Sequence, residues 1–406
     1  MKNKTGIWIA GAKGDIATTM MVGTIAIRAG LVSTHGLTTM LPPMNQLSLV
    51  GLDDLVFGGI DVSDRPLSAS AQSLYATSRT ISRETLDAAL PEIERIEHDI
   101  LVDRQMAWKP RSPRDQSKTL AEHIADITGA IAAFKSRHDL DRVVVVNLSS
   151  VEPDPAPSPG HETLEGLDRL IADDDKDAVM PGVCYAYAAL KSGCPYVNFT
   201  PNAGASMAAI DELARQAGLP YYGSDGKTGE TLVKTALAPM FAYRNLRVLS
   251  WEGINMLGNN DGKSLDESDN KIAKIRNKGG VLSDILGYSP HAGIDINYVP
   301  SLGDWKTAWD LIHFQGFLDT NMTMQFTWQG CDSVLAAPLV IDIVRMAEFA
   351  CREKESGQMR HLAAFFKNPL GVKEMALHSQ FQMLLDYTMR HLGEKQTLSR
   401  THDAGF

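Results

Sequence analysis

Four short apolar runs, at 6–10, 55–60, 142–146 and 195–197, divide the first half of the chain. They lack the polar alternation of a half-buried strand, so each predicts a strand that is buried on both faces, as in a parallel sheet. Polar residues follow each run, at the edge where such sheets bind ligands. The pattern therefore predicts a ligand site at the carboxyl ends of these strands.

Longer stretches have the apolar content and spacing of helices. They are 118–135, 207–217 and 332–350. The segment 64–117 is polar and contains four prolines, so we expect it to be irregular.

The pattern changes after Lys234, where runs at 246–251, 295–300 and 322–328 predict further strands. The last of these alternates weakly, as one strand of an antiparallel sheet would. A chain of 406 residues is also longer than one ordinary core requires. We therefore expect a Rossmann-type doubly wound α/β domain with an inserted, mixed α/β catalytic and oligomerisation domain. The expected boundaries are 1–231 and 333–406 for the first domain and 232–332 for the second.

Composition narrows the class of protein. Lysine and arginine number 39 against 49 acidic residues, a net charge of −10, which argues against bulk affinity for nucleic acid or an anionic membrane. No run of 18 apolar residues occurs, so we expect no membrane span. The four cysteines form no C-x-x-C pair and suit a reducing cytoplasm. The histidines show no metal-ligand spacing, so no metal site is predicted.

A glycine turn, Gly11 to Ala17, joins the first predicted strand to a predicted helix. Gly11 permits a tight turn, Gly14 permits close approach of a pyrophosphate, and Ala17 permits helix-on-strand packing. Strand, glycine turn and helix in this order indicate dinucleotide binding. Asp61, at the end of the second run, has two interpretations: a ligand for a ribose hydroxyl, or a cap for the next turn.

A second glycine-rich loop spans 223–231 and leads into a predicted helix. Its backbone N–H groups could hold a phosphate. Gly226-Lys227-Thr228 matches the end of a P-loop, but Tyr221 stands where that motif needs glycine, so a P-loop is disfavoured. The alternative is an ordinary polar turn that caps a helix.

Several lysines are candidates for the chemistry of an anionic substrate. Lys274 and Lys278 share a face if their segment is helical, which is unfavourable unless an anion lies between them. Lys367 follows two aromatic residues, a setting that can desolvate an amine. For these residues and for Lys306 the alternative is a solvated surface lysine.

Together these segments resemble the inositol-3-phosphate synthase (myo-inositol-1-phosphate synthase) family over nearly the whole chain. The strongest matches are Phe57-Gly58-Gly59-Ile60-Asp61, Lys227-Thr228-Gly229-Glu230-Thr231, Gly258-Asn259-Asn260-Asp261-Gly262, Gly303-Asp304-x-Lys306, Cys331-Asp332-Ser333 and Phe366-Lys367-Asn368-Pro369. The resemblance implies NAD as cofactor and conversion of D-glucose 6-phosphate to 1D-myo-inositol 3-phosphate. It implies oxidation at C5, loss of a C6 proton, aldol closure on C1 and re-reduction at C5. It also implies a homotetramer.

The resemblance assigns roles position by position. The implied catalytic residues are Lys274, Lys306, Lys367, Asp225 and Asp332. The implied contacts to the substrate phosphate are Lys278, Thr228, Gly229, Glu230 and Asn259. The implied cofactor-binding residues are Gly11, Ala12, Lys13, Gly14, Asp15, Asp61, Asn147, Ser149, Asn198 and Asp225.

Two departures from the family pattern concern the glycine loops. Glu230 replaces a glutamine, and a carboxylate near a phosphate is unfavourable unless it points away or pairs with a lysine. Lys13 replaces the first of two adjacent glycines. These changes leave room for a related cyclase that gives another cyclitol phosphate.

Two further alternatives remain at this point. One is an NAD(P)-dependent sugar-phosphate dehydrogenase that releases its oxidised product. The other is a regulator that binds NAD without catalysis. Simple dehydrogenation needs one acid–base group, so a set of four lysines between 274 and 367 favours a reaction with several proton transfers.

Overall fold

The computed structural model describes residues 4–107, 117–258 and 280–403, with side chains described up to 393. A seven-stranded sheet forms its centre, in the order β11-β6-β5-β4-β1-β2-β3, and all its pairings are parallel. The strands are β1 (Thr5–Ala10), β2 (Leu55–Asp61), β3 (Ile100–Val102), β4 (Arg142–Asn147), β5 (Tyr196–Asn198), β6 (Pro220–Tyr222) and β11 (Gly357–Gln358). The order reverses between β1 and β4, which is where doubly wound sheets bind ligands.

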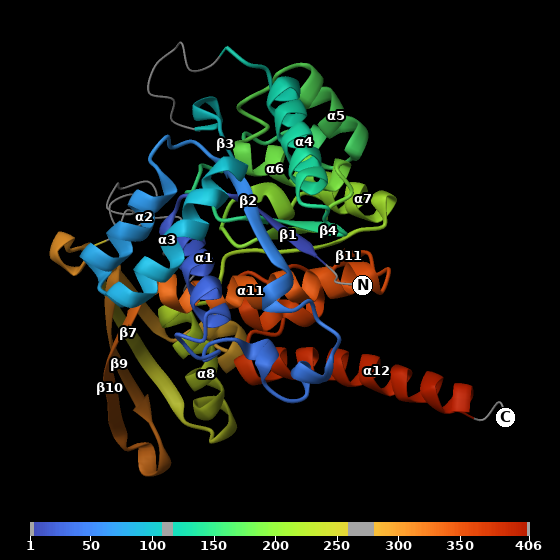
Figure 1. Ribbon diagram of the computed structural model, residues 1–406. Helices are drawn as coiled ribbons and strands as arrows, with labels where there is room; N and C mark the ends of the chain where they lie inside the picture. The colour runs from blue at the N-terminus through green and yellow to red at the C-terminus, as the bar shows by residue number, and fades with distance from the viewer. Residues whose placement is uncertain (1–3, 108–116, 259–279, 404–406) are drawn as a thin grey trace.

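Both faces of this sheet are buried, which explains why β1 is apolar from Gly6 to Ala10. Ile7 and Ile9 belong to one hydrophobic cluster, whereas Trp8 and Ala10 belong to another. The first cluster holds α1 (Asp15–Arg28), α3 (Arg83–Ile96) and α11 (Asp332–Arg352). The second holds α4 (Leu120–Arg137), α5 (Leu164–Ala172), α6 (Pro181–Lys191) and α7 (Ala208–Ala217). Figure 1 shows these two groups of helices on opposite sides of the sheet. The expected doubly wound fold is confirmed.

The expectation of an irregular segment at 64–117 is wrong for its described part. It contains α2 (Leu67–Ser73), α3 and β3. Ser82 caps α3 by accepting a hydrogen bond from the Thr85 N–H at 3.0 Å, and Leu86 and Ile93 bury its apolar face. Pro91 lies inside this helix, where it removes one backbone donor, and burial of the apolar face outweighs that loss.

A second sheet of four strands has the order β10-β9-β7-β8. Its strands are β7 (Arg247–Leu257), β8 (His291–Tyr298), β9 (Trp305–Gln315) and β10 (Asn321–Cys331). The antiparallel pairing expected for 322–328 is confirmed, because β10 runs antiparallel to β9. The sequence pattern did not predict β9. The helix α8 (Gly229–Tyr243) packs Phe241 against Trp251 of this sheet.

The chain returns to the first sheet after β10. The helix α11 begins at the residue after β10 and packs in the same cluster as α1. The last helix, α12 (Leu377–Asp403), packs Leu384 and Tyr387 into the first cluster, and its carboxyl-terminal end extends beyond the main body (Figure 1). Among the described residues, no helix has the length and apolar content that a membrane crossing would need.

Candidate functional site

A cavity of about 680 Å³ lies at the carboxyl edge of the seven-stranded sheet, and the second sheet and α11 close its other side. Twelve residues named from the sequence line it: Gly11, Lys13, Gly14, Asp15, Asp61, Ser149, Asp225, Thr228, Glu230, Lys306, Asp332 and Lys367. Four others do not line it: Ala12, Asn147, Asn198 and Gly229. Three more lie outside the described residues: Asn259, Lys274 and Lys278.

The first glycine turn forms one end of the cavity. Gly11 has a φ of 83°, and a Cβ atom there would lie 2.7 Å from the carbonyl oxygen of Leu148. Glycine is therefore required by both conformation and space. Gly14 caps α1 without a side chain, which leaves the first N–H groups of the helix available to a ligand. This arrangement fits an anionic pyrophosphate.

Asp61, at the end of β2, caps the turn that follows it, which is one of the two roles that the sequence allowed. Its carboxylate accepts hydrogen bonds from the Lys13 N–H and the Ser63 N–H, both at 2.8 Å. Burial raises the pKa of Asp61, and these N–H groups partly offset the increase. Because a carboxylate has about four acceptor positions, Asp61 can hold its loop and still accept a ribose hydroxyl from the cavity.

The side chain of Lys13 is held by an acidic residue. Its ammonium lies 2.7 Å from Glu97, and its side chain is 2% exposed. Ser70 donates a hydrogen bond to the Lys13 carbonyl at 3.0 Å. Lys13 therefore ties the glycine turn to α2 and to the segment after α3.

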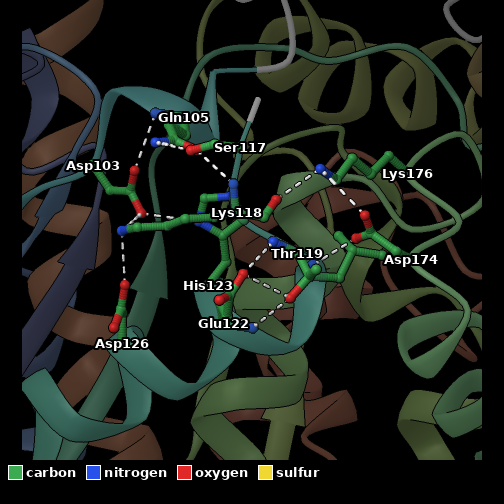
Figure 2. A network of polar contacts seen from close by, with 11 residues as sticks. Asp103, Gln105, Ser117, Lys118, Thr119, Glu122, His123, Asp126, Asp174 and Lys176 are labelled. Atoms are coloured by element: carbon green, nitrogen blue, oxygen red, sulfur yellow. Dashed lines mark hydrogen bonds and ion pairs between the residues drawn. The ribbon is translucent and has the colours of Figure 1, made fainter. Parts of the chain in front are cut away.

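A polar network around Asp103 anchors the loop that follows β3 (Figure 2). Asp103 lies 2.9 Å from His123 Nδ1 and 3.1 Å from Lys118 Nζ, and its own N–H donates to the carbonyl of Asp61 at 3.0 Å. Burial acts to raise the pKa of Asp103, but the bonds from His123 and Lys118 outweigh it and set that pKa at about 2. Met106, whose N–H donates to the Asp103 carbonyl at 3.2 Å, lines the cavity.

Asn147 and Asn198, two of the asparagines named from the sequence, do not line the cavity themselves. Both are fully buried. Asn147 accepts a hydrogen bond from the Ser149 N–H at 3.0 Å, and Asn198 accepts one from the Thr200 N–H at 3.1 Å. Ser149 and Thr200 line the cavity, so the asparagines position residues that face it.

A backbone clasp brings Lys367 to Asp225. Gly226 and Phe366 form an antiparallel bridge, and the Lys367 N–H donates to the Asp225 carbonyl at 2.6 Å. The Lys367 ammonium donates to Asp225 Oδ1 at 2.8 Å. Asp225 has a φ of 60°, a left-handed conformation that aspartate adopts more readily than most residues. The pair is partly exposed and faces the cavity.

Lys306 comes to the cavity from β9. Its Nζ lies 3.7 Å from Asp332 Oδ2, and a Cβ at Gly229 would lie 3.2 Å from the same Nζ. Gly229 also has a φ of 60°, so glycine permits both the turn into α8 and the approach of Lys306. Asp304, to which the sequence gave no role, accepts a hydrogen bond from the Ser333 N–H at 3.3 Å and fixes the start of α11.

Lys227, in the loop that resembles the end of a P-loop, does not line the cavity. It is 1% exposed and donates a hydrogen bond to Gln380 of α12. Burial lowers the pKa of Lys227 to about 8. The structure therefore agrees with the inference that this loop is no P-loop.

The sequence did not identify two residues that line the cavity, Glu152 and Asn255. The Glu152 carboxylate accepts a hydrogen bond from the Gly182 N–H at 3.1 Å, and burial raises its pKa to about 7. Asn255 lies on β7 and is 1% exposed. Neither residue sits in a recognisable motif, so the sequence pattern held no signal for them.

Comparisons with known proteins agree with this geometry. A family model described as Myo-inositol-1-phosphate synthase, and named for NAD binding, matches residues 5–390. The inositol-3-phosphate synthase 1 of Bacteroides thetaiotaomicron is 32% identical, over 97% of this chain and 96% of its own. That of Dictyostelium discoideum is 28% identical, over 86% of this chain and 75% of its own.

Two solved structures share the fold. The inositol-3-phosphate synthase of Caenorhabditis elegans has a TM-score of 0.83 at 23% identity, over 96% of this chain and 86% of its own. A myo-inositol-1-phosphate synthase-related protein of Thermotoga maritima has a TM-score of 0.76 at 24% identity, over 95% of this chain and 98% of its own.

Proposed function

Because this chain belongs to the myo-inositol-1-phosphate synthase family, we propose that it converts D-glucose 6-phosphate to 1D-myo-inositol 3-phosphate with NAD as cofactor and without net redox change. The observation that carries the proposal is the meeting of two lysine–aspartate pairs in one cavity. Lys367 with Asp225 and Lys306 with Asp332 come from distant parts of the chain. The glycine turn at Gly11 lines the same cavity.

The cofactor would be held at the end of the cavity that the first sheet forms. The start of α1 suits the pyrophosphate, and Asp61 suits a ribose hydroxyl. Ser149 also lines the cavity. When bound, NAD⁺ supplies the reversible oxidation of one sugar carbon.

The start of α8 suits the substrate phosphate. Thr228 caps this helix without a side-chain hydrogen bond, so its first N–H groups can donate to an anion. Lys306 lies over Gly229 at the same place and adds positive charge. Lys278 and Asn259, which lie outside the described residues, remain proposed phosphate contacts on the resemblance.

The lysines would carry the proton chemistry. The ammonium groups of Lys306 and Lys367 can stabilise negative charge on sugar oxygens and exchange protons with them. Asp225 and Asp332 hold these ammonium groups in place. Lys274 remains a proposed catalytic residue on the resemblance. Residues of both sheets line the cavity, so the oxidised sugar can stay beside the lysines for ring closure.

Three further features belong to the same proposal. We propose that 232–332 acts as the catalytic and oligomerisation unit, and 1–231 with 333–406 as the NAD-binding unit. A homotetramer is supported by the resemblance and by β10, an edge strand whose residues 321–323 are exposed. A cytoplasmic location is supported by four cysteines that are free thiols.

Product stoichiometry tests the proposed function. Purified protein is incubated with D-glucose 6-phosphate and a small amount of NAD⁺, and products are followed by phosphorus and proton NMR. We expect an inositol monophosphate in molar excess over NAD⁺. Accumulation of NADH in step with a keto sugar would instead show the dehydrogenase alternative. Binding of NAD⁺ without turnover of any sugar phosphate would favour the regulator.

A further inference from the structure

Three buried polar side chains meet where α8 packs on β7, at the edge of the cavity. Glu230 is 3% exposed, Lys234 is 2% exposed and Asn255 is 1% exposed. The Lys234 ammonium donates to Glu230 Oε1, and Asn255 Nδ2 donates to Glu230 Oε2. Glu230 and Asn255 both line the cavity.

The sequence builds this cluster from two matching periodicities. Glu230 and Lys234 are four residues apart and share a face of α8. On β7 the inward positions alternate, and Trp251, Gly253 and Asn255 meet that face. Trp251 lies under the Lys234 ammonium at 5.9 Å, and a Cβ at Gly253 would lie 2.6 Å from Glu230 Oε1.

The donor inventory fixes the orientation of the Asn255 amide. A carboxylate only accepts hydrogen bonds, so Glu230 can be met only by the NH₂ group of Asn255. The Asn255 Oδ1 atom must then face the other way. It is buried, and within 4–107, 117–258 and 280–393 it has no hydrogen-bond partner. A glutamine at 230 could instead offer either its oxygen or its NH₂ group, and Asn255 could adopt both orientations.

We propose that Asn255 Oδ1 is an acceptor site for one hydroxyl group of the sugar chain, and that Glu230 and Lys234 are positioning residues that set its orientation. This inference rests on the proposed function, because it assigns a substrate contact within the same cavity. A carbonyl oxygen repels phosphate and attracts hydroxyl donors, so the site selects for the polyol part of the substrate. An analogue without that hydroxyl leaves a buried acceptor unpaired, which lowers affinity.

This account and a purely electrostatic account predict opposite results. If Glu230 acted only as a negative charge near the substrate phosphate, Glu230→Gln would strengthen the binding of every anion. If Glu230 orients Asn255, the same change frees the amide and weakens binding of the sugar. Inorganic phosphate has no polyol chain, so its affinity would not fall.

The first test compares Glu230→Gln with wild type by calorimetry, in the presence of NADH so that the sugar is not oxidised, with D-glucose 6-phosphate and with inorganic phosphate. We expect the Kd for glucose 6-phosphate to rise about 2-fold, because an amide that is free in both orientations presents Oδ1 about half of the time, while the Kd for phosphate does not rise. Equal or tighter binding of glucose 6-phosphate would overturn the inference. The matched control is Glu252→Gln, on the opposite face of β7, which should change neither value.

Glu230→Gln leaves the buried Lys234 ammonium with one partner fewer, so a second variant guards against misfolding. Glu230→Gln with Lys234→Met removes both charges together. The same rise in the sugar Kd is expected, with the Kd for NAD⁺ unchanged. A parallel loss of NAD⁺ binding would overturn the inference, because a positioning role toward the sugar alone does not alter the cofactor site.

Deoxy sugars give a third, independent readout on the Asn255→Leu variant. The wild-type protein should bind one of the 2-, 3- and 4-deoxy analogues of glucose 6-phosphate about 10-fold more weakly than it binds the parent sugar. Asn255→Leu should bind that analogue and the parent sugar equally. If Asn255→Leu still binds every analogue more weakly than the parent sugar, by the same factor as wild type does, the inference is overturned. If wild type neither binds nor converts glucose 6-phosphate, the proposed function itself fails.

Discussion

The Lys367 ammonium donates a hydrogen bond to Asp225 Oδ1 at 2.8 Å, although 142 residues separate the two in the sequence. The backbone bridge between Gly226 and Phe366 brings the two residues together, and the ion pair then holds the ammonium in position. A lysine fixed in this way can act on a substrate without a large cost in side-chain entropy. The arrangement of this site and its surroundings leads to four predictions.

Lys367 and Asp225 should act as one unit. Lys367→Ala should lower turnover roughly 100-fold or more, because a positioned acid–base group is lost. Asp225→Asn should lower it roughly 10- to 100-fold, through loss of a charge-assisted hydrogen bond. The double variant should be little worse than Lys367→Ala alone, since the two residues share one function.

The measurement is steady-state turnover of glucose 6-phosphate for all three variants. Lys373→Ala is the control, because Lys373 is exposed and does not line the cavity. Fully additive losses in the double variant would show that the two residues act separately.

Gly11→Ala should weaken both the fold and cofactor binding. The left-handed φ of 83° and the 2.7 Å approach to the Leu148 carbonyl oxygen leave no room for a methyl group. We expect a loss of about 1–3 kcal/mol in the free energy of unfolding, measured by denaturant, and a higher Kd for NAD⁺. Gly23→Ala is the contrasting variant, since Gly23 lies inside α1 with no atom near its Cβ position. Gly23→Ala should raise the free energy of unfolding by about 0.5–1 kcal/mol, and a decrease would contradict the open space that the structure shows beside Gly23.

The network at Asp103 should contribute to cofactor affinity at a distance. Asp103→Asn removes the charge that holds His123 and Lys118, and so loosens the loop that carries Met106 to the cavity. We expect the Kd for NAD⁺ to rise about 10-fold while the Kd for glucose 6-phosphate changes little. Calorimetry with each ligand measures both values. A rise in the Kd for glucose 6-phosphate alone would contradict a role of this network in cofactor binding.

Buried Lys227 should make stability depend on alkaline pH. Its folded pKa of about 8 lies below the ordinary 10.5, so between these values the unfolded chain binds more protons than the folded one. The burial penalty of the ammonium is therefore present in full below about pH 8 and is relieved as pH rises toward 10.5. The relief is on the order of 3 kcal/mol. The free energy of unfolding of wild type, relative to Lys227→Met, should rise from pH 8 to 10; a constant difference would refute this.

The sequence predicted those parts of the fold that have strong local signals. Strands such as β1 and β4 are continuous apolar runs, so burial on both faces is visible in their residues. In contrast, β9 carries polar residues such as Lys306 and Asp310 among its apolar ones, because they serve the cavity and a buried network. The strands β6 and β11 have three and two residues, too few for any period to show.

The site was predictable only in part, for a related reason. The glycine turn at Gly11 is local and has its own signature. The meeting of Lys367 with Asp225 depends on tertiary structure, and only the family resemblance indicated it. Asn255 had no signal at all, because its role arises from Glu230 on a different element.

The central claim is that oxidation, ring closure and re-reduction occur in one enclosed cavity without release of the intermediate. The most direct measurement uses D-glucose 6-phosphate that carries deuterium at C5, together with catalytic unlabelled NAD⁺. We predict that the inositol phosphate product retains the deuterium, and that early turnovers place none of it on free NADH. Deuterium that appears in free NADH, with product labelled below the substrate, would contradict the claim and show that the site releases what it oxidises.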